Sequence, residues 1–344
     1  MSKNSSSFFS KVKDVLPMIF MGFLILAVQL GALWLSSNEY ITEQPVFENP
    51  ESVGNAVYYI VILLVFSAIV VYAVKKSKTG FIRGVVYLSI TVTFFYVISS
   101  IIAEITTLTG MLSLAAAALS LILAVILYKY PEWYVIDIAG IVISVGACAI
   151  IGVSLSILPI FVLLLALLIY DFISVYKTKH MLTLAGGMMD MKLPILFVVP
   201  KHLGYSYIKD DFSDKDIQPK EDEAENENKT ESKTENKTED KNENKEEPVD
   251  EKKERGALFM GLGDAVIPTL LVVSANHFIP HDGIISIPAL LTMAGTFVGF
   301  AALMYVVSKG NPQAGLPFLN TGAMAGFLIG VFVSGISVMS FLPF

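Results

Sequence analysis

Residues 256–273 read GALFMGLGDAVIPTLLVV, an apolar run nearly long enough to cross a bilayer that contains a single carboxylate, Asp264. A charged side chain in hydrocarbon costs about 3 kcal/mol or more, and each glycine inside a helix costs about 0.5–1 kcal/mol relative to alanine. This run carries both costs, because Gly261 and Gly263 stand beside the acid. We therefore expect Asp264 to serve a chemical function.

The composition of the whole chain is that of a membrane protein. Of its 344 residues, 54% are hydrophobic and only 16% are charged, which excludes an ordinary water-soluble globule. The acidity is confined to one segment: residues 210–255 contain 19 acidic and 10 basic residues, whereas the rest of the chain contains 12 and 14. We expect no nucleic-acid partner. Cys148 is the only cysteine, and no cysteines and histidines stand at metal-ligand spacing, so we expect no metal.

Nine apolar runs have roughly the 20 residues that are needed to cross a bilayer core. They are residues 15–35, 55–74, 81–103, 111–128, 134–151, 154–176, 256–276, 284–307 and 317–340. The sequence therefore predicts an all-α, polytopic membrane protein with nine transmembrane helices.

The basic residues predict how these helices are oriented. Lysines precede the first run, and lysine or arginine occurs in every second loop after it, whereas the loops between contain neither. Because cytoplasmic loops carry an excess of lysine and arginine, we expect the N-terminus in the cytoplasm and the C-terminus outside. The protein is then a multi-pass protein of the cell membrane.

The chain is expected to have four parts. Residues 1–180 form an N-terminal six-helix bundle, and residues 256–344 form a C-terminal three-helix part. Residues 181–209 form an interfacial or extended segment, because residues 195–199 are β-branched or apolar between two prolines. Residues 210–255 form a disordered, charged cytoplasmic loop, since they contain too few large apolar side chains to fold.

Only one other acid, Asp171, lies well inside an apolar run. At 1.5 Å per residue, Asp171 and Asp264 lie about 9 Å and about 13 Å from the cytoplasmic ends of consecutive, antiparallel helices. Two carboxylates in a site of low dielectric constant cannot both ionise easily and share one proton. That is the working state of an aspartic protease, in which one acid activates water and the other protonates the scissile carbonyl. Glycines at 261 and 263 would let a substrate backbone approach.

Other roles for the two acids remain open at this point. Each could be hydrogen-bonded to a neighbouring helix for packing alone, or the pair could bind protons or cations in a transporter or channel. Many transporters contain similar halves, and we find no such repeat in the sequence. A third alternative is a catalytically silent scaffold. Asp137 falls near the end of its run, and we expect it at the membrane interface.

Two motifs resemble those of a known family. Tyr170 and Asp171 form a YD pair, and GLGD follows at residues 261–264, after a long hydrophilic loop. Together they resemble the presenilin and signal peptide peptidase family of intramembrane aspartyl proteases. The resemblance covers most of the chain, and its orientation is similar to that of presenilin. The compact chain suggests a microbial, archaeal presenilin homologue.

The family has a third motif, Pro-Ala-Leu, at the start of its last helix. The matching stretch here is QAGLPFL, in which Ala314 replaces the proline, Gly315 replaces the alanine, and Leu316 is retained and followed by Pro317. This departure affects how the loop shapes the substrate site, and it leaves the assignment of the acids unchanged.

The resemblance implies an aspartic endopeptidase of the GxGD type that hydrolyses peptide bonds within transmembrane segments of other proteins. It implies Asp171 and Asp264 as the catalytic residues, without a metal or organic cofactor, and gives no indication of obligate partner subunits. The supporting residues would be Tyr170, Gly261, Leu262, Gly263, Ala314, Gly315, Leu316 and Pro317. A helical substrate must unwind before its carbonyl can be attacked. We expect residues 195–199, or the stretch before Gly261, to pair with the unwound segment as an added strand.

Overall fold

The structure is a computed structural model that describes residues 3–76, 79–106, 109–176, 193–202, 204–209, 256–308 and 315–337. The predicted loop at 210–255, residues 181–192 and 203 of the predicted segment at 181–209, and Ala314 lie outside this range. The elements, in chain order, are α1 (Lys3–Ser36), α2 (Glu39–Thr42), α3 (Val53–Lys75), α4 (Thr79–Ile105), α5 (Gly110–Lys129), α6 (Trp133–Ser154), α7 (Ile157–Tyr176), β1 (Leu196–Pro200), β2 (Ala257–Gly261), α9 (Leu262–Phe278), α10 (Ile287–Val307) and α11 (Gly315–Val333).

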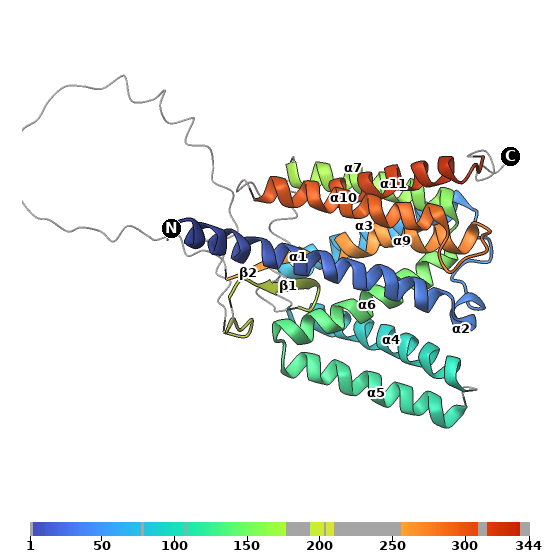
Figure 1. Ribbon diagram of the computed structural model, residues 1–344. Coiled ribbons are helices and arrows are strands. Elements are labelled where there is room, and N and C mark those ends of the chain that lie inside the picture. The colour runs from blue at the N-terminus through green and yellow to red at the C-terminus, as the bar shows by residue number, and fades with distance from the viewer. Residues whose placement is uncertain are drawn as a thin grey trace, which may run out of the picture.

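The molecule is a bundle of long helices with one small sheet at the end where α1 begins (Figure 1). In the described part of the chain, seven helices are long and apolar enough to cross a membrane, and the apolar stretches Ile157–Ile173 in α7 and Leu262–Phe278 in α9 are shorter. The helices α3 and α5 expose many large apolar side chains. Such surfaces suit contact with lipid rather than with water.

The prediction of a helix at 256–276 is wrong for the residues before Leu262. Residues 257–261 form β2, which pairs with β1 in an antiparallel sheet, and the helix begins only at Leu262. An apolar run by itself does not distinguish a helix from a buried strand. Here the pairing with β1 satisfies the backbone. The protein is therefore mostly helical rather than all-α, and residues 195–199 are extended as expected, since β1 covers 196–200.

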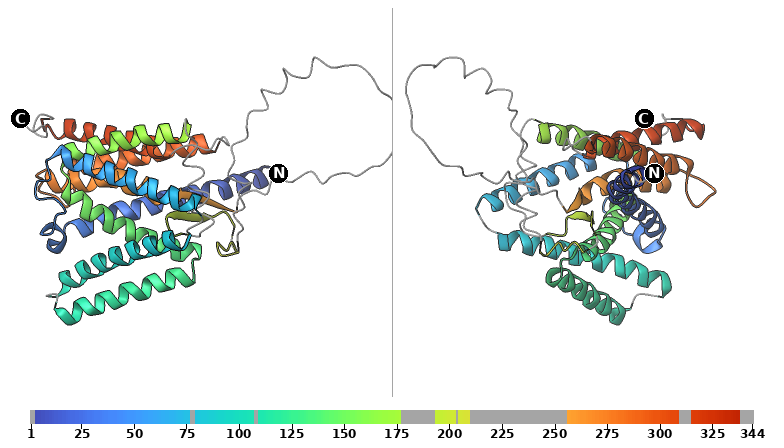
Figure 2. Two further views of the ribbon diagram at one scale, coloured as in Figure 1. Left: turned by 180° about the vertical axis from the view of Figure 1, so that it is seen from behind. Right: turned by 60° about the vertical axis from the view of Figure 1, so that its left-hand side comes forward.

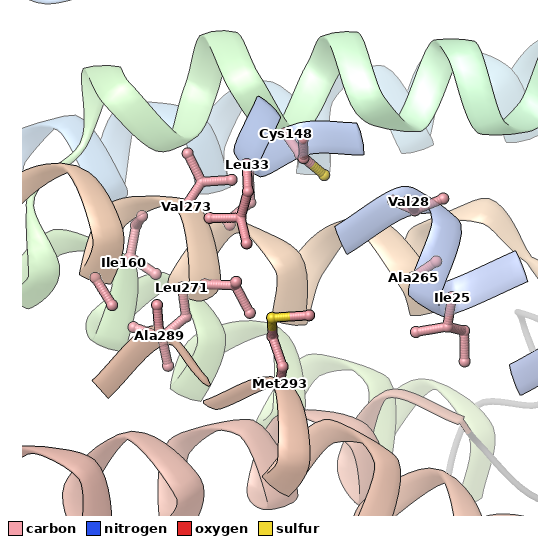
Figure 3. Close-up of a cluster of buried hydrophobic side chains, with 14 of the residues drawn as sticks. Ile25, Val28, Leu33, Cys148, Ile160, Ala265, Leu271, Val273, Ala289 and Met293 are labelled. Carbon is pink, nitrogen blue, oxygen red and sulfur yellow. The ribbon is translucent and has the colours of Figure 1, made fainter. Parts of the chain in front are cut away.

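Helix α9 lies at the centre of the bundle, where it contacts α1, α6, α7, α10 and α11. Figure 3 shows Ala265, Leu271 and Val273 of α9 among side chains of the surrounding helices. All three are fully buried. Since lipid tails are as apolar as these side chains, close van der Waals packing holds such helices together in a membrane. Asp264 thus stands on the most enclosed helix of the bundle.

The helices α4 and α5 lie at one side of the bundle, far from α10 and α11, in both views of Figure 2. On the opposite side, α10 and α11 pack most closely, through glycines spaced four residues apart. These are Gly295 and Gly299 of α10 and Gly322, Gly326 and Gly330 of α11. A Cβ atom on Gly322 would overlap the carbonyl oxygen of Gly295. Small residues at this spacing let two membrane helices approach backbone to backbone.

Replacing Gly322 with leucine is expected to lower the stability of the folded protein by about 1–3 kcal/mol or more, because α10 and α11 must separate to admit the side chain. Thermal unfolding of the purified protein in detergent measures this as a lower midpoint. Gly84→Leu is the matched control, since a Cβ atom on Gly84 would have no neighbour within 4 Å. Equal midpoints for the two variants would contradict the close packing of these helices.

Candidate active site

Asp171 lies near the C-terminal end of α7 and is buried, with 2% of its surface exposed. Its Oδ1 atom has no hydrogen-bond partner among the described residues. Buried polar atoms are nearly always hydrogen-bonded, and an exception calls for a specific explanation. A carboxyl oxygen left open in this way is available to a water molecule or to a reacting group.

Asp264 lies in the first turn of α9. The helix begins at Leu262, and Gly261 caps it in an extended conformation with φ −62° and ψ 139°. The half-buried carboxylate of Asp264 accepts a hydrogen bond from the backbone N–H of Gly261. An acid three residues after the cap bonds back to the cap in this way in many helices, and the N-terminal end of a helix favours negative charge. The GLGD sequence therefore fixes the side chain at the junction of strand and helix.

The two acids meet. Helix α7 packs against α9, and the carboxylates of Asp171 and Asp264 are close enough to interact electrostatically. Their helices run in opposite directions, so the end of one and the start of the other lie at the same end of the bundle as the sheet (Figure 1). The sequence predicts that the two acids lie at similar depths in the membrane, and the structure places them near each other.

A third acid, Asp137, lies in the first turns of α6 and is buried among other side chains, with 4% of its surface exposed. Its predicted place near the membrane interface stays a prediction. Its Oδ1 accepts a hydrogen bond from the backbone N–H of Val198 at 2.8 Å. Burial alone would not separate this acid from the other two. The carboxylate of Asp137 faces β1, whereas the electrostatic partner of Asp264 is Asp171.

The sheet runs directly into the site. In the antiparallel register Leu196 lies opposite Gly261 and Pro200 lies opposite Ala257. The pairing continues past both ends, because the N–H of Leu262 donates to the carbonyl of Ile195 at 3.1 Å and the N–H of Lys201 donates to that of Gly256 at 2.9 Å. The ordered backbone of the sheet therefore ends two residues before Asp264.

Gly315, the first residue of α11, contacts Asp264 directly. A Cβ atom on Gly315 would lie 2.7 Å from Oδ2 and 2.9 Å from Cγ of Asp264. A side chain at this position would fit only if the Asp264 carboxylate shifted. The part of the predicted third motif that the structure describes thus begins α11, and its first residue, Gly315, lies against the carboxylate.

The remaining predicted residues are distributed as follows. Leu262 is half-buried and faces α6, where its side chain would lie 2.9 Å from a Cβ atom on Gly140. Leu316 is buried and Pro317 is half-buried in the first turn of α11. Gly263 is exposed, and Tyr170 is 38% exposed although its neighbour Asp171 is buried. The structure therefore brings together Asp171, Asp264, Gly261 and Gly315.

The donor set of this site suits acid–base chemistry. Two carboxyl groups that share a proton can take a proton from water with one member and give a proton to a carbonyl oxygen with the other. Among the residues that the structure describes, no group of three or more His, Cys, Asp or Glu side chains could hold a metal ion.

Comparison with known proteins gives two findings. The model of a family described as signal-peptide peptidase, presenilin aspartyl protease matches residues 21–336. The chain is also similar to a solved structure of a presenilin family intramembrane aspartate protease in space group C222, with 31% identity, a TM-score of 0.63, and coverage of 92% of this chain and 99% of that one. A second structure of such a protease, in space group P2, shows 30% identity, a TM-score of 0.62 and coverage of 92% and 98%. No curated protein matches the chain.

Proposed function

The chain belongs to the family of signal-peptide peptidases and presenilin aspartyl proteases, and from this premise we propose that Asp171 and Asp264 are its catalytic pair. The family match and the structural neighbours confirm the resemblance seen in the sequence, and the protein is an intramembrane aspartyl protease. They do not favour a proton- or cation-coupled transporter or channel. The observation that carries the assignment of the pair is that α7 packs against α9 with the two carboxylates close enough to interact electrostatically.

The reaction follows from a pair that holds one proton. The ionised carboxylate takes a proton from a water molecule, whose oxygen attacks the scissile carbonyl carbon, while the protonated carboxyl donates its proton to the carbonyl oxygen. The resulting tetrahedral diol collapses when the carboxyl that took the proton from water gives it to the amide nitrogen and the C–N bond breaks. A hydroxyl of the diol then returns a proton to the other carboxylate, which restores the pair. The open Oδ1 of Asp171 offers an acceptor for the water. No metal or organic cofactor takes part in this scheme.

Family members cleave transmembrane substrates within the bilayer. For this chain we infer nine membrane-spanning helices in the cell membrane, with the N-terminus in the cytoplasm and the C-terminus outside. The alternation of basic loops supports this topology. The start of α1 and the end of α11 lie at opposite ends of the bundle (Figure 1), as an odd number of spans requires. The partners are then other membrane proteins and the lipid, without nucleic acid or obligate subunits.

The sheet offers a place for the substrate backbone. A transmembrane substrate hides its scissile carbonyl in a helical hydrogen bond, so it must unwind, and its freed backbone groups then need partners within the membrane. An added strand beside β1 or β2 would supply them. Because β2 ends at the cap of α9, such a strand would bring its carbonyl groups to Asp264. The segment Ala314–Gly315–Leu316–Pro317, Gly263 and Tyr170 would complete the surroundings of the scissile bond.

A transition-state mimic tests this function. A single-span peptide in which a hydroxyethylene group replaces the scissile amide carries a tetrahedral carbon with a hydroxyl, and it is expected to inhibit cleavage competitively. Binding should be at least about 100-fold tighter than that of the amide peptide, because the pair is complementary to the tetrahedral state. Inhibition of cleavage of a single-span substrate in detergent, with purified protein, gives the measurement.

The peptide with the opposite configuration at the hydroxyl carbon is the matched control, since its length and apolar surface are identical. Equal inhibition by the two isomers would show that the carboxylates do not bind the hydroxyl of the tetrahedral carbon. A wild-type protein that forms no product from any single-span substrate would refute the function for this chain.

A further inference from the structure

The buried carboxyl group of Asp137 has no part in the reaction described above, yet it forms a hydrogen bond with the backbone of β1. It lies in the first turns of α6, which packs along β1 (Figure 1). Its Oδ1 accepts a hydrogen bond from the backbone N–H of Val198 at 2.8 Å. Its Oδ2 has no hydrogen-bond partner among the described residues. Burying a carboxyl group is costly unless it is paired or hydrogen-bonded, so this contact needs an explanation.

The register of the sheet shows which edge Asp137 occupies. Successive residues of a strand direct their backbone groups to opposite sides, so residues that bond to the partner strand alternate with residues that face away. Ile195 and Lys201 bond to the segment of β2 and its flanks. By alternation, the backbone groups of Val198 face away from β2. Asp137 therefore binds the centre of the outer edge of β1.

An outer edge is normally a template for another strand, because its N–H and carbonyl groups are unpaired. At the outer edge of β1 the central N–H is already taken. A peptide that approached this edge would find the N–H of Val198 already bonded. Asp137 thus closes this edge by occupying its central donor.

We propose that Asp137 is a positioning residue. It binds β1 on the edge that faces away from β2 and prevents a substrate strand from pairing there, so that an unwound substrate can pair only with β2. The proposal rests on the proposed function. Its consequence for cleavage is geometric. The backbone of β2 continues into Asp264 through Gly261, whereas a strand beside β1 would lie one sheet spacing, about 4.8 Å, further from β2. Edge selection therefore determines whether the scissile carbonyl reaches the pair.

The test compares Asp137→Leu with Asp137→Asn in the full-length protein, using a single-span substrate in detergent. Leucine removes the acceptor and opens the edge, so we expect kcat/KM to fall about 10-fold or more, with new cleavage positions detected by mass spectrometry. Asparagine keeps an oxygen for the N–H of Val198 and should retain the wild-type position, with kcat/KM within about threefold. Ser144→Ala is the control, because Ser144 is buried on the same face two turns further along α6.

Val198→Pro deletes the same hydrogen bond from the other partner and serves if Asp137→Leu does not fold. Proline is tolerated on an edge strand where the N–H faces away from the partner, so the pairing of β1 with β2 is retained. We expect the same added cleavage positions as for Asp137→Leu. The double variant Asp137→Leu/Val198→Pro should have a kcat/KM no lower than that of either single variant, since both substitutions remove the same interaction. Unchanged positions and unchanged kcat/KM in both folded single variants would overturn the proposal.

Amide hydrogen exchange gives a readout that does not depend on activity. The peptide that covers residues 196–200 should exchange faster in Asp137→Leu than in the wild type and at the wild-type rate in Asp137→Asn. If exchange changes as expected but the wild type cleaves no substrate, then Asp137 holds β1 and it is the proposed function that fails. If exchange is the same in all three proteins, Asp137 does not hold β1.

Discussion

Replacing either Asp171 or Asp264 with asparagine is expected to eliminate cleavage of a single-span substrate, a loss of at least about 1,000-fold. An amide cannot take a proton from water and cannot donate the acidic proton that the carbonyl oxygen requires. In the proposed mechanism the two carboxyl groups share one proton, so neither works without the other. The measurement is product formation in detergent over a time course that would detect residual activity.

The double variant Asp171→Asn/Asp264→Asn should be no less active than either single variant, since residues that act as a unit lose their contribution together. Asp282→Asn is the control, because Asp282 lies in an exposed connection between α9 and α10. The variants of Asp171 and Asp264 should unfold at the wild-type midpoint or above it, since removing a buried charge relieves a cost. If either single variant cleaves the substrate at the same peptide bond as the wild type, Asp171 and Asp264 are not the catalytic pair.

Gly315→Val is expected to lower kcat by about 100-fold while the protein remains folded, because the new side chain would displace the Asp264 carboxylate and a misplacement of about 1 Å at a reacting group costs about that factor. A Cβ atom alone would lie 2.7 Å from Oδ2. Gly315→Ala, which restores the residue of the family motif, should show a smaller loss of the same kind. Steady-state kinetics separate this effect on kcat from an effect on KM.

The matched control is Gly84→Val, since a side chain on Gly84 of α4 meets nothing within 4 Å. Equal kcat for the wild type, Gly84→Val and Gly315→Val would show that the contact between α11 and Asp264 has no effect on the reaction. A lower thermal midpoint for Gly315→Val alone would instead indicate that the glycine is needed for packing.

The long helices could be predicted from the sequence because crossing a bilayer imposes a length that can be counted. The run at 111–128 corresponds to α5, Gly110–Lys129, and the run at 134–151 corresponds to α6, Trp133–Ser154. The proximity of the two central acids could also be anticipated, since consecutive antiparallel helices must bring residues of equal depth to the same level. Both inferences need only the local sequence and the geometry of the membrane.

What could not be predicted depends on segments that are far apart in the chain. The strand at 257–261 exists because residues 196–200 pair with it, and its composition is equally suited to a helix. The buried carboxyl group of Asp137 bonds to Val198, which lies 61 residues later in the chain. The contact of Gly315 with Asp264 joins two helices that are not consecutive. The only trace of these contacts in the sequence is the resemblance of QAGLPFL to a family motif.

The shortness of α9 has a consequence for the supply of water. A helix of 17 residues is about 25 Å long, whereas the hydrocarbon layer is about 30 Å thick. Other helices enclose α9, so protein rather than lipid fills the missing depth, and the two-stranded sheet occupies it on one side. Asp264, in the first turn of α9, is therefore set back from the surface of the layer by the depth of the sheet, and the hydrolytic water must reach it between the sheet and the surrounding helices.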